Sequence, residues 1–144
     1  MFYADTSAVL PFYRGESASD AIEHLLFAQH QPPVISELVR VEFASALARW
    51  VRMGELNEAQ ANRIESAFHE DVREGRFRLV SLDSSAFDRA MHWLLTRRTS
   101  LKTLDALHLA CAEANQAPLL TLDQALLASA EFLGVATFSD LDPK

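Results

Sequence analysis

Short apolar runs alternate along the chain with longer segments of helical periodicity. The apolar runs have the character of buried strands and occupy residues 1–5, 33–35, 77–81, 118–121 and 135–138. Between them, apolar side chains recur every three or four residues, which predicts helices over 17–30, 36–53, 57–74, 83–96, 103–115 and 123–134. This alternation indicates βαβ units. We therefore expect a three-layer α/β/α fold, with helices on both faces of a central, mostly parallel sheet of about five strands.

The size and composition of the chain fit one globular domain over residues 1–144. Hydrophobic residues make up 49% of the chain and charged residues 23%, ordinary values for a protein with a sizeable core. No apolar run approaches the ~20 residues of a membrane-spanning helix, and no basic, signal-like segment opens the chain. Cys111 is the single cysteine, which excludes an intramolecular disulfide. We expect a cytoplasmic protein without membrane contact.

Four carboxylates lie on otherwise apolar elements. Asp5 and Asp123 each follow an apolar run that is predicted to be a strand, whereas Glu42 and Asp105 lie near the starts of predicted helices. Carboxylates are rarely buried without a partner, because an isolated buried charge is costly. The four acids therefore predict a bound cation, and a hard divalent metal is the one that oxygen ligands favour.

The expected topology brings these acids together. Ligands of open α/β sheets bind outside the carboxyl ends of the strands, which is where Asp5 and Asp123 are predicted to lie. Mg²⁺ or Mn²⁺ held by such carboxylates lowers the pKa of a bound water and polarises a phosphoryl oxygen. The four acids are therefore candidate catalytic residues for the hydrolysis of phosphodiester bonds.

Three hydroxyl groups lie beside two of these acids. Thr6 and Ser7 follow Asp5, and Thr121 precedes Asp123 by two residues. They could orient the carboxylates or a metal-bound water from a second layer of contacts. Thr6 or Ser7 could equally cap a short helix that begins at residue 7, and this alternative stays open.

Each acid also has a purely structural interpretation. Asp5 or Asp123 could cap the helix that follows it, a contact worth about 1 kcal/mol. Asp105 could interact with the helix dipole in its first turn. Glu42 lies too deep in its helix to cap it, but an arginine such as Arg49 could pair with it. The functional interpretation therefore rests on the four acids as a set.

The charge distribution bears on possible partners. The net charge of −7 argues against broad affinity for nucleic acid, although catalytic carboxylates would contribute several of these charges and bound cations would offset them. Arginine outnumbers lysine by eleven to two, and guanidinium groups suit phosphate. Arg97, Arg98 and Lys102 precede Asp105. They could steer a phosphate, or Arg97 and Arg98 could simply stabilise a helix end.

Four motifs, in order, resemble those of the PIN domain family. They are 3–8 (YADTSA), 36–47 (SELVRVEFASAL), 104–110 (LDALHLA) and 121–123 (TLD), and each contains one of the four acids. The resemblance covers essentially the whole chain. In size and in the texture of its motifs, the chain looks most like the VapC-type toxins of prokaryotic type II toxin–antitoxin modules.

This resemblance implies a PIN fold and a Mg²⁺- or Mn²⁺-dependent endoribonuclease that acts as a toxin on an RNA substrate. It further implies a homodimer and a cognate antitoxin protein that occupies the active-site groove. By position, Asp5 and Asp105 would be direct metal ligands, and Glu42 and Asp123 direct or water-mediated ones. The polar helical hairpin at 50–68 would contact the antitoxin or the second subunit, with a solvent-facing helical pair as the alternative.

His108 lies on the helix of Asp105, three residues further on. A single histidine on an apolar helix face is expected to be a hydrogen-bonded core residue. General-base catalysis is the alternative.

Three other functions fit the sequence less well. A non-catalytic PIN-like module that binds RNA or protein is the main alternative, but it would have no need for four clustered acids. A haloacid-dehalogenase-type phosphatase requires a second aspartate two residues after the first, and Ser7 stands there after Asp5. Nucleotide binding by a Gly-rich phosphate loop is excluded, because the four glycines are scattered.

Overall fold

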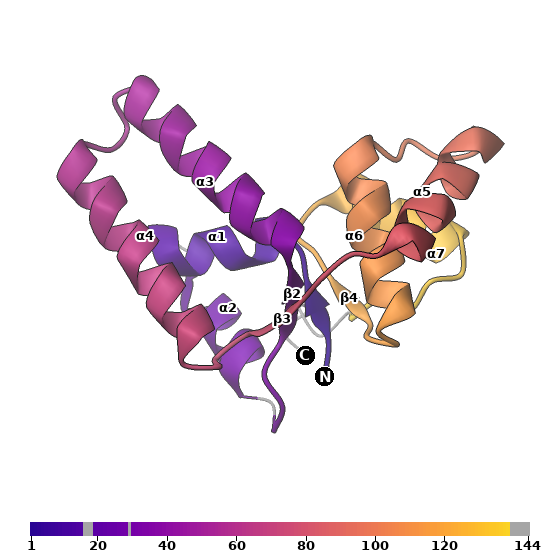
Figure 1. Cartoon of the computed structure of the whole chain (residues 1–144), viewed down its shortest axis with the longest axis horizontal. Coiled ribbons are helices and arrows are strands. Elements are labelled where there is room, and N and C mark those ends of the chain that lie inside the picture. The colour runs from indigo at the N-terminus through magenta and orange to yellow at the C-terminus, as the bar shows by residue number, and fades with distance from the viewer. Residues whose placement is uncertain (16–18, 29, 139–144) are drawn as a thin grey trace.

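The structure is a computed structural model that describes residues 1–15, 19–28 and 30–138 (Figure 1). The strands within these residues are β1 (Tyr3–Ala4), β2 (Val34–Ser36), β3 (Arg78–Val80) and β4 (Leu119–Leu120). The helices are α1 (Thr6–Arg14), α2 (Ser19–Phe27), α3 (Glu37–Arg52), α4 (Glu58–Arg73), α5 (Ser84–Thr96), α6 (Thr103–Ala114) and α7 (Gln124–Phe132). None of these helices combines the length and the apolar character that a bilayer crossing requires.

The predicted order of strands and helices is confirmed, with two differences. Helix α1 follows β1 where only a short helix from residue 7 was considered, and the sheet differs at one edge. Residues 17, 18 and 29 of the predicted helix 17–30 lie outside the described residues. The run 135–138 contributes a single parallel bridge between Leu119 and Thr137 in place of a strand. Two backbone hydrogen bonds hold it, from the Leu119 amide to Ala136 and from the Phe138 amide to Leu119. The short strand β4 offers little edge for more, so the described residues form a sheet of four strands where about five were expected.

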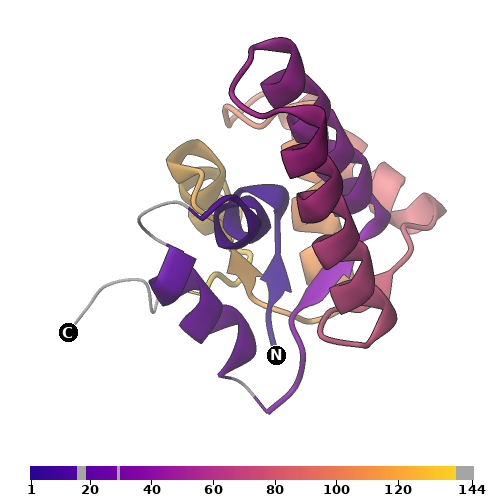
Figure 2. The ribbon, with the colours of Figure 1, turned by 90° about the vertical axis from the view of Figure 1, so that its left-hand side faces the viewer.

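All four strands run parallel, in the order β3-β2-β1-β4. The chain proceeds outward from β1 to β2 and β3, and then returns to the far side of β1 for β4. Crossovers between parallel strands are right-handed, so a reversal of direction moves the connecting helices to the opposite face. Helices α1 to α4 accordingly lie on one side of the sheet and α5 to α7 on the other, as predicted for three layers (Figures 1 and 2).

Two hydrophobic cores flank the sheet, because successive strand side chains point to opposite faces. In β1, Tyr3 enters the core beneath α5, α6 and α7, whereas Phe2 and Ala4 enter the core beneath α1 to α4. Leu119 and Leu120 of β4 divide in the same way. Strands β1, β2 and β4 are therefore buried on both sides, which explains their continuous apolar runs, whereas β3 at the edge is only partly buried.

The reversal of strand order creates a switch point between β1 and β4. In open α/β sheets, ligands bind in the crevice at the carboxyl ends of the strands beside such a point. Asp5 directly follows β1, and Thr121 directly follows β4. The topology thus directs attention to the residues at this edge of the sheet.

Candidate active site

Asp5 is buried at the carboxyl end of β1, and both of its oxygens accept hydrogen bonds. The Ser7 hydroxyl (2.7 Å) and the Ala8 amide (3.2 Å) donate to Oδ1, and the Thr121 hydroxyl (2.6 Å) donates to Oδ2. The hydrogen bond from the Ala8 amide makes Asp5 the N-cap of α1, so the capping contact predicted as an alternative is present. Burial raises the pKa of the Asp5 carboxyl above its ordinary value, and the bonds from Thr121 and Ser7 offset only part of that rise.

Asp123 is joined to Asp5 through Thr121. The Asp123 amide donates to the Thr121 hydroxyl (3.0 Å), which itself donates to Asp5. The Asp123 side chain caps α7, since Oδ1 accepts from the amides of Ala125 (2.9 Å) and Leu126 (3.1 Å). No described residue donates a hydrogen bond to Oδ2. One carboxylate oxygen thus fixes the side chain, and the other is left to accept a further contact.

Glu42 lies on the second turn of α3, and its side chain reaches across to α1 and α6. Oε1 accepts from the Thr6 hydroxyl (2.9 Å) and from Nε2 of His108. The partners of Glu42 are thus a histidine and a threonine, and the alternative that Glu42 pairs with Arg49 is wrong. Burial raises the pKa of this half-buried carboxyl, but the hydrogen bonds outweigh burial and the net pKa is lowered. Glu42 is therefore ionised, and no described residue donates to its Oε2.

Asp105 differs from the other three acids, because no described residue donates a hydrogen bond to its carboxylate. It is half buried in the first turn of α6. Burial first, and then the negative charges of Asp123 and Glu42, raise the pKa of the Asp105 carboxyl. The charges of Asp123 and Glu42 therefore act on the Asp105 carboxylate. An unpartnered carboxylate close to two like charges is the arrangement that a cation would relieve.

Two residues of the site escaped the sequence analysis, because Tyr3 belongs to an apolar run and Ser36 stands at the start of a helix, where it caps α3. Tyr3 and Ser36 are fully buried, and the hydroxyl of Tyr3 lies 2.8 Å from Oγ of Ser36 and 2.7 Å from Nδ1 of His108. His108 is thus the hydrogen-bonded core residue that was expected. The signal for Tyr3 was its hydroxyl in an otherwise apolar strand, which a buried position obliges to find a partner.

The donor set fits a hard divalent cation in kind, since Asp5, Glu42, Asp105 and Asp123 offer carboxylate oxygens and nothing softer. In the described residues, no three acidic, histidine or cysteine side chains are gathered tightly enough to form a ready-made metal cage. Carboxylates of like charge repel one another, so a cation would have to draw these donors together or be held in part through water. Asp105, with no competing donor, is the ligand most available to it.

The basic tract lies at the turn between α5 and α6. Arg97 ends α5 in the left-handed conformation (φ 56°), and Arg97 and Arg98 are exposed. Lys102 precedes α6 at its N-cap position and lowers the pKa of Asp105 slightly against the larger opposing effects. Lys102 is therefore the member of the tract that lies nearest the acids.

The fold and this edge together define an α/β/α protein with an acidic centre at the switch point of a parallel sheet. The chain belongs to the PIN domain family, whose model matches residues 2–132. No curated protein matches the chain significantly in sequence.

Three solved structures illustrate the likeness. VapC20 of Mycobacterium tuberculosis, a toxin that cleaves the sarcin–ricin loop, has a TM-score of 0.69 and 14% identity over 99% of this chain and 100% of that chain. A toxin–antitoxin complex from Klebsiella pneumoniae gives 0.64 and 20%, over 95% and 97% of the two chains. FitAcB from Neisseria gonorrhoeae gives 0.71 and 17%, over 96% and 97%. At these identities the likeness establishes the shared fold.

Proposed function

We propose that this protein is a metal-dependent endoribonuclease that hydrolyses phosphodiester bonds of RNA in the cytoplasm. The observation that carries the proposal is the Asp105 carboxylate, half buried beside Asp123 and Glu42 and without a hydrogen-bond donor among the described residues. A cation bound there would offset the repulsion that raises the pKa of the Asp105 carboxyl. Family membership supports the same chemistry, since the four acids occupy the four motifs that resemble the PIN family.

The chain's own residues divide the work of binding and orienting. Asp105 and Asp5 would hold Mg²⁺ or Mn²⁺ directly, and the bound ion would activate water and neutralise charge on the phosphate. Oδ2 of Asp123 and Oε2 of Glu42, to which no described residue donates a hydrogen bond, would complete the set directly or through water. The hydroxyls of Thr6, Ser7 and Thr121 keep two of the acids in place, since Thr6 donates to Glu42, and Ser7 and Thr121 donate to Asp5.

We further infer that the protein is the toxin of a type II toxin–antitoxin pair. Two similar structures support this role, since one is a toxin that cleaves the sarcin–ricin loop and another is a toxin–antitoxin complex. A cognate antitoxin would restrain the nuclease by covering the acidic edge. The hairpin of α3 and α4 projects from the body of the molecule beside that edge and stays our candidate for part of the antitoxin contact (Figure 1).

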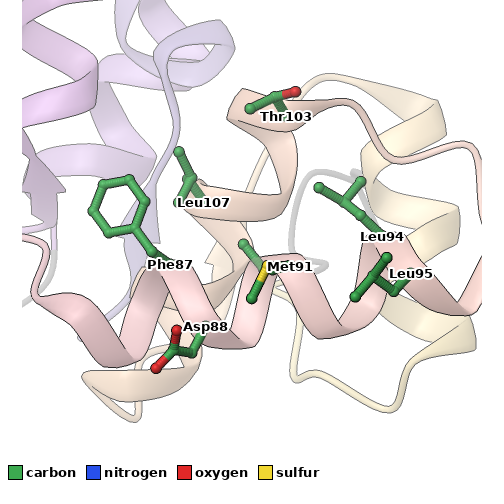
Figure 3. Close-up of a pocket in the computed structure, with 8 residues that line it drawn as sticks. Phe87, Asp88, Met91, Leu94, Leu95, Thr103 and Leu107 are labelled. Atoms are coloured by element: carbon green, nitrogen blue, oxygen red, sulfur yellow. The ribbon is translucent and has the colours of Figure 1, made fainter.

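An apolar face on α5 supports assembly as a homodimer. Phe87, Met91 and Leu95 recur at intervals of four residues and are 53%, 54% and 62% exposed. With Leu94 and Leu107 they line a groove of about 530 Å³ between α5 and α6 (Figure 3). Exposed apolar patches of this kind mark interaction surfaces. Sequence analysis missed this face, although the spacing of its apolar residues was a visible signal.

The charges at the two ends of α5 favour a second copy as the occupant of this face. Asp83 and Asp88 lie toward the start of the helix, and Arg97 and Arg98 follow its end. A two-fold axis near Met91 would set the helices antiparallel and bring the acidic end of each against the basic end of the other. Pairing through this face would therefore match apolar with apolar and negative with positive surface.

The dimer surface is tested with Met91→Asp and, as a matched control, Met53→Asp at the exposed hairpin tip. Met91→Asp should convert the protein to a monomer in sedimentation velocity, and Met53→Asp should leave it dimeric. The opposite result would assign the dimer contact to the hairpin.

The nuclease is tested with Asp105→Asn beside Asp20→Asn, an exposed aspartate on α2. The purified proteins are assayed for RNA cleavage over a titration of Mg²⁺ and Mn²⁺. Asp105→Asn should lose activity on the order of 100-fold or more, because several kcal/mol of transition-state stabilisation depend on the metal. Asp20→Asn should cleave as the wild type does.

Full activity of Asp105→Asn would contradict the proposal. Wild-type protein that binds RNA but leaves it intact with either metal would instead identify a non-catalytic binding module. Expression of the wild type in bacteria should also arrest growth, and Asp105→Asn should not.

A further inference from the structure

A buried chain of hydrogen bonds runs from the start of α3 through the core to Glu42. The Leu38 amide donates to Oγ of Ser36 (3.2 Å), Ser36 bonds to the Tyr3 hydroxyl (2.8 Å), and Tyr3 bonds to Nδ1 of His108 (2.7 Å). The other ring nitrogen of His108 bonds to Oε1 of Glu42. The chain thus joins β2, β1, α6 and α3 through side chains that are almost wholly buried up to Glu42.

The direction of these bonds follows from Glu42. An ionised carboxylate only accepts, so Nε2 of His108 must donate. Nδ1 can then accept from Tyr3, whose phenol keeps its proton because burial raises its pKa. Tyr3 in turn accepts from Ser36, and Ser36 from the Leu38 amide. Every group in the chain then donates toward Glu42, and none is left without a partner.

The chain of hydrogen bonds fixes Oε1 of the Glu42 carboxylate and leaves Oε2 free to accept a further contact. Both donors, His108 and Thr6, bond to Oε1, and no described residue donates to Oε2. A glutamate side chain is otherwise free to sample several rotamers. Holding Oε1 from two sides therefore sets the direction of Oε2.

The need to find partners for buried groups does not explain the hydrogen bond between His108 and Glu42. The Glu42 side chain is 28% exposed and could be solvated without His108, whereas the His108 side chain is 2% exposed. A histidine that only had to satisfy its own ring in the core could bond to backbone carbonyls. Instead it connects the partly exposed acid to three buried groups, so the bond serves the orientation of the acid.

We propose that His108 is a positioning residue, which holds Glu42 so that Oε2 can take part in binding the metal. The inference rests on the proposed function in that Glu42 is taken as one of the acids of the site. Both ring nitrogens of His108 are already hydrogen-bonded, so His108 itself would touch neither metal nor substrate. It would form a hydrogen bond to the metal ligand Glu42 from outside the metal's coordination shell. Loss of such hydrogen-bond partners typically weakens metal affinity or activity by 10–100-fold.

Two substitutions at position 108 separate positioning from mere packing. In His108→Asn the amide can reach Tyr3 but is too short to reach Glu42. In His108→Gln the longer side chain carries an amide donor to about the place of Nε2. Mn²⁺ affinity, measured on the full-length protein by electron paramagnetic resonance without RNA, should fall about 10–100-fold in His108→Asn and only a few-fold in His108→Gln.

A double-substitution cycle with Glu42→Gln tests whether the effect passes through the acid. If His108 acts only through Glu42, Glu42→Gln and the pair Glu42→Gln/His108→Asn should bind Mn²⁺ with the same affinity. Thermal unfolding of every variant reports whether it is folded. Should His108→Asn unfold, Tyr3→Phe takes its place, since it breaks the chain one link earlier and should weaken Mn²⁺ binding by a few-fold.

The possible failures are distinguishable. Wild-type affinity in a folded His108→Asn protein, or equal losses in His108→Asn and His108→Gln, would overturn the positioning role and leave the nuclease proposal intact. A wild-type protein that binds no Mn²⁺ would overturn both. Because the measurement uses no RNA, a failure to find the RNA substrate does not affect it.

Discussion

The two faces of the sheet are packed with different kinds of residues. The face under α1 to α4 is built on aromatic rings, which belong to Phe12, Tyr13, Phe27, Phe43, Phe68 and Phe77. The face under α5, α6 and α7 is rich in alanine, with Ala86, Ala90, Ala106, Ala110, Ala112, Ala117 and Ala130 in its core. The first fills space with large side chains, and the second brings backbones close together.

This difference corresponds to a division of roles. Rings bury large areas and give the aromatic face much of the stability of the molecule. Alanines let α6 approach β1 closely enough for His108 and Tyr3 to bond across the core. The four acids, by contrast, lie at helix starts, where Asp5 and Asp123 cap α1 and α7, and Glu42 and Asp105 lie in the first two turns of α3 and α6. We therefore expect substitutions on the aromatic face to change stability and those on the alanine face to change the site.

The largest effect on stability should come from Phe68→Ala. Phe68 is buried and stacks on Phe43 with ring centroids 4.2 Å apart, and Tyr13 meets both rings edge-on. Removal of such a ring leaves a cavity and should lower the free energy of unfolding by about 3–5 kcal/mol. Denaturant unfolding measures the change. Phe132→Ala, at an exposed ring on α7, is the control and should stay within about 0.5 kcal/mol of the wild type.

Ala112→Leu tests the close approach of α6 to the sheet. Ala112 is fully buried and lies one turn after His108. A larger side chain there should cost about 1–3 kcal/mol through overpacking. It should also reduce RNA cleavage per folded molecule, because α6 carries both Asp105 and His108. Ala128→Leu, on an exposed position of α7, is the matched control. Unchanged activity in folded Ala112→Leu would show that the site tolerates a displaced helix.

Two tyrosines allow the faces to be compared directly. Tyr3→Phe removes a fully buried hydroxyl on the alanine face and leaves the Ser36 hydroxyl proton and Nδ1 of His108 without a partner, at a cost of about 1–3 kcal/mol. Tyr13→Phe removes the hydroxyl that donates to Asp71 on the aromatic face. Both should lower thermal stability. Only Tyr3→Phe should weaken Mn²⁺ binding, and equal effects of the two on metal affinity would contradict the division of roles.

The smallest effect is expected at the outer surface of the alanine face, with Asp83→Ala. Asp83 caps α5, and its bonds from Ser85 first and from Ala86 lower the pKa of its carboxyl. A lowered folded-state pKa means that the contribution to stability is present above the ordinary pKa of aspartate and is lost as the pH falls through the folded pKa. Asp83→Ala should therefore melt slightly below the wild type at neutral pH, and the difference should vanish in acid. A difference that persists in acid would point to another cause.

Local chemistry made much of this molecule predictable. The helical period of the apolar residues and the capping residues predicted where helices lie. The capping box of Asn57 and Gln60 at the start of α4 is an example. Asp5 and Asp123 could be assigned to strand ends because each directly follows an apolar run. The edge strand at 135–138 was overestimated, since an apolar run does not reveal how much of a neighbouring strand is available to pair with it.

The partners of the acids, in contrast, could not be predicted from neighbouring residues. Glu42 suggested an arginine on its own helix and instead meets His108, 66 positions away. Tyr3 meets His108 across 105 positions, and Thr121 meets Asp5 across 116.

These contacts exist because β4 pairs with β1 on the side opposite β2, and because α6 packs against the sheet face that carries Tyr3. Periodicity and capping depend on residues that are close in sequence. The sequence by itself therefore determined which acids follow strands and which begin helices. Which donor fastens each carboxylate, and which oxygen stays open, depends on the order of the strands, because only their pairing brings such distant side chains within hydrogen-bond reach.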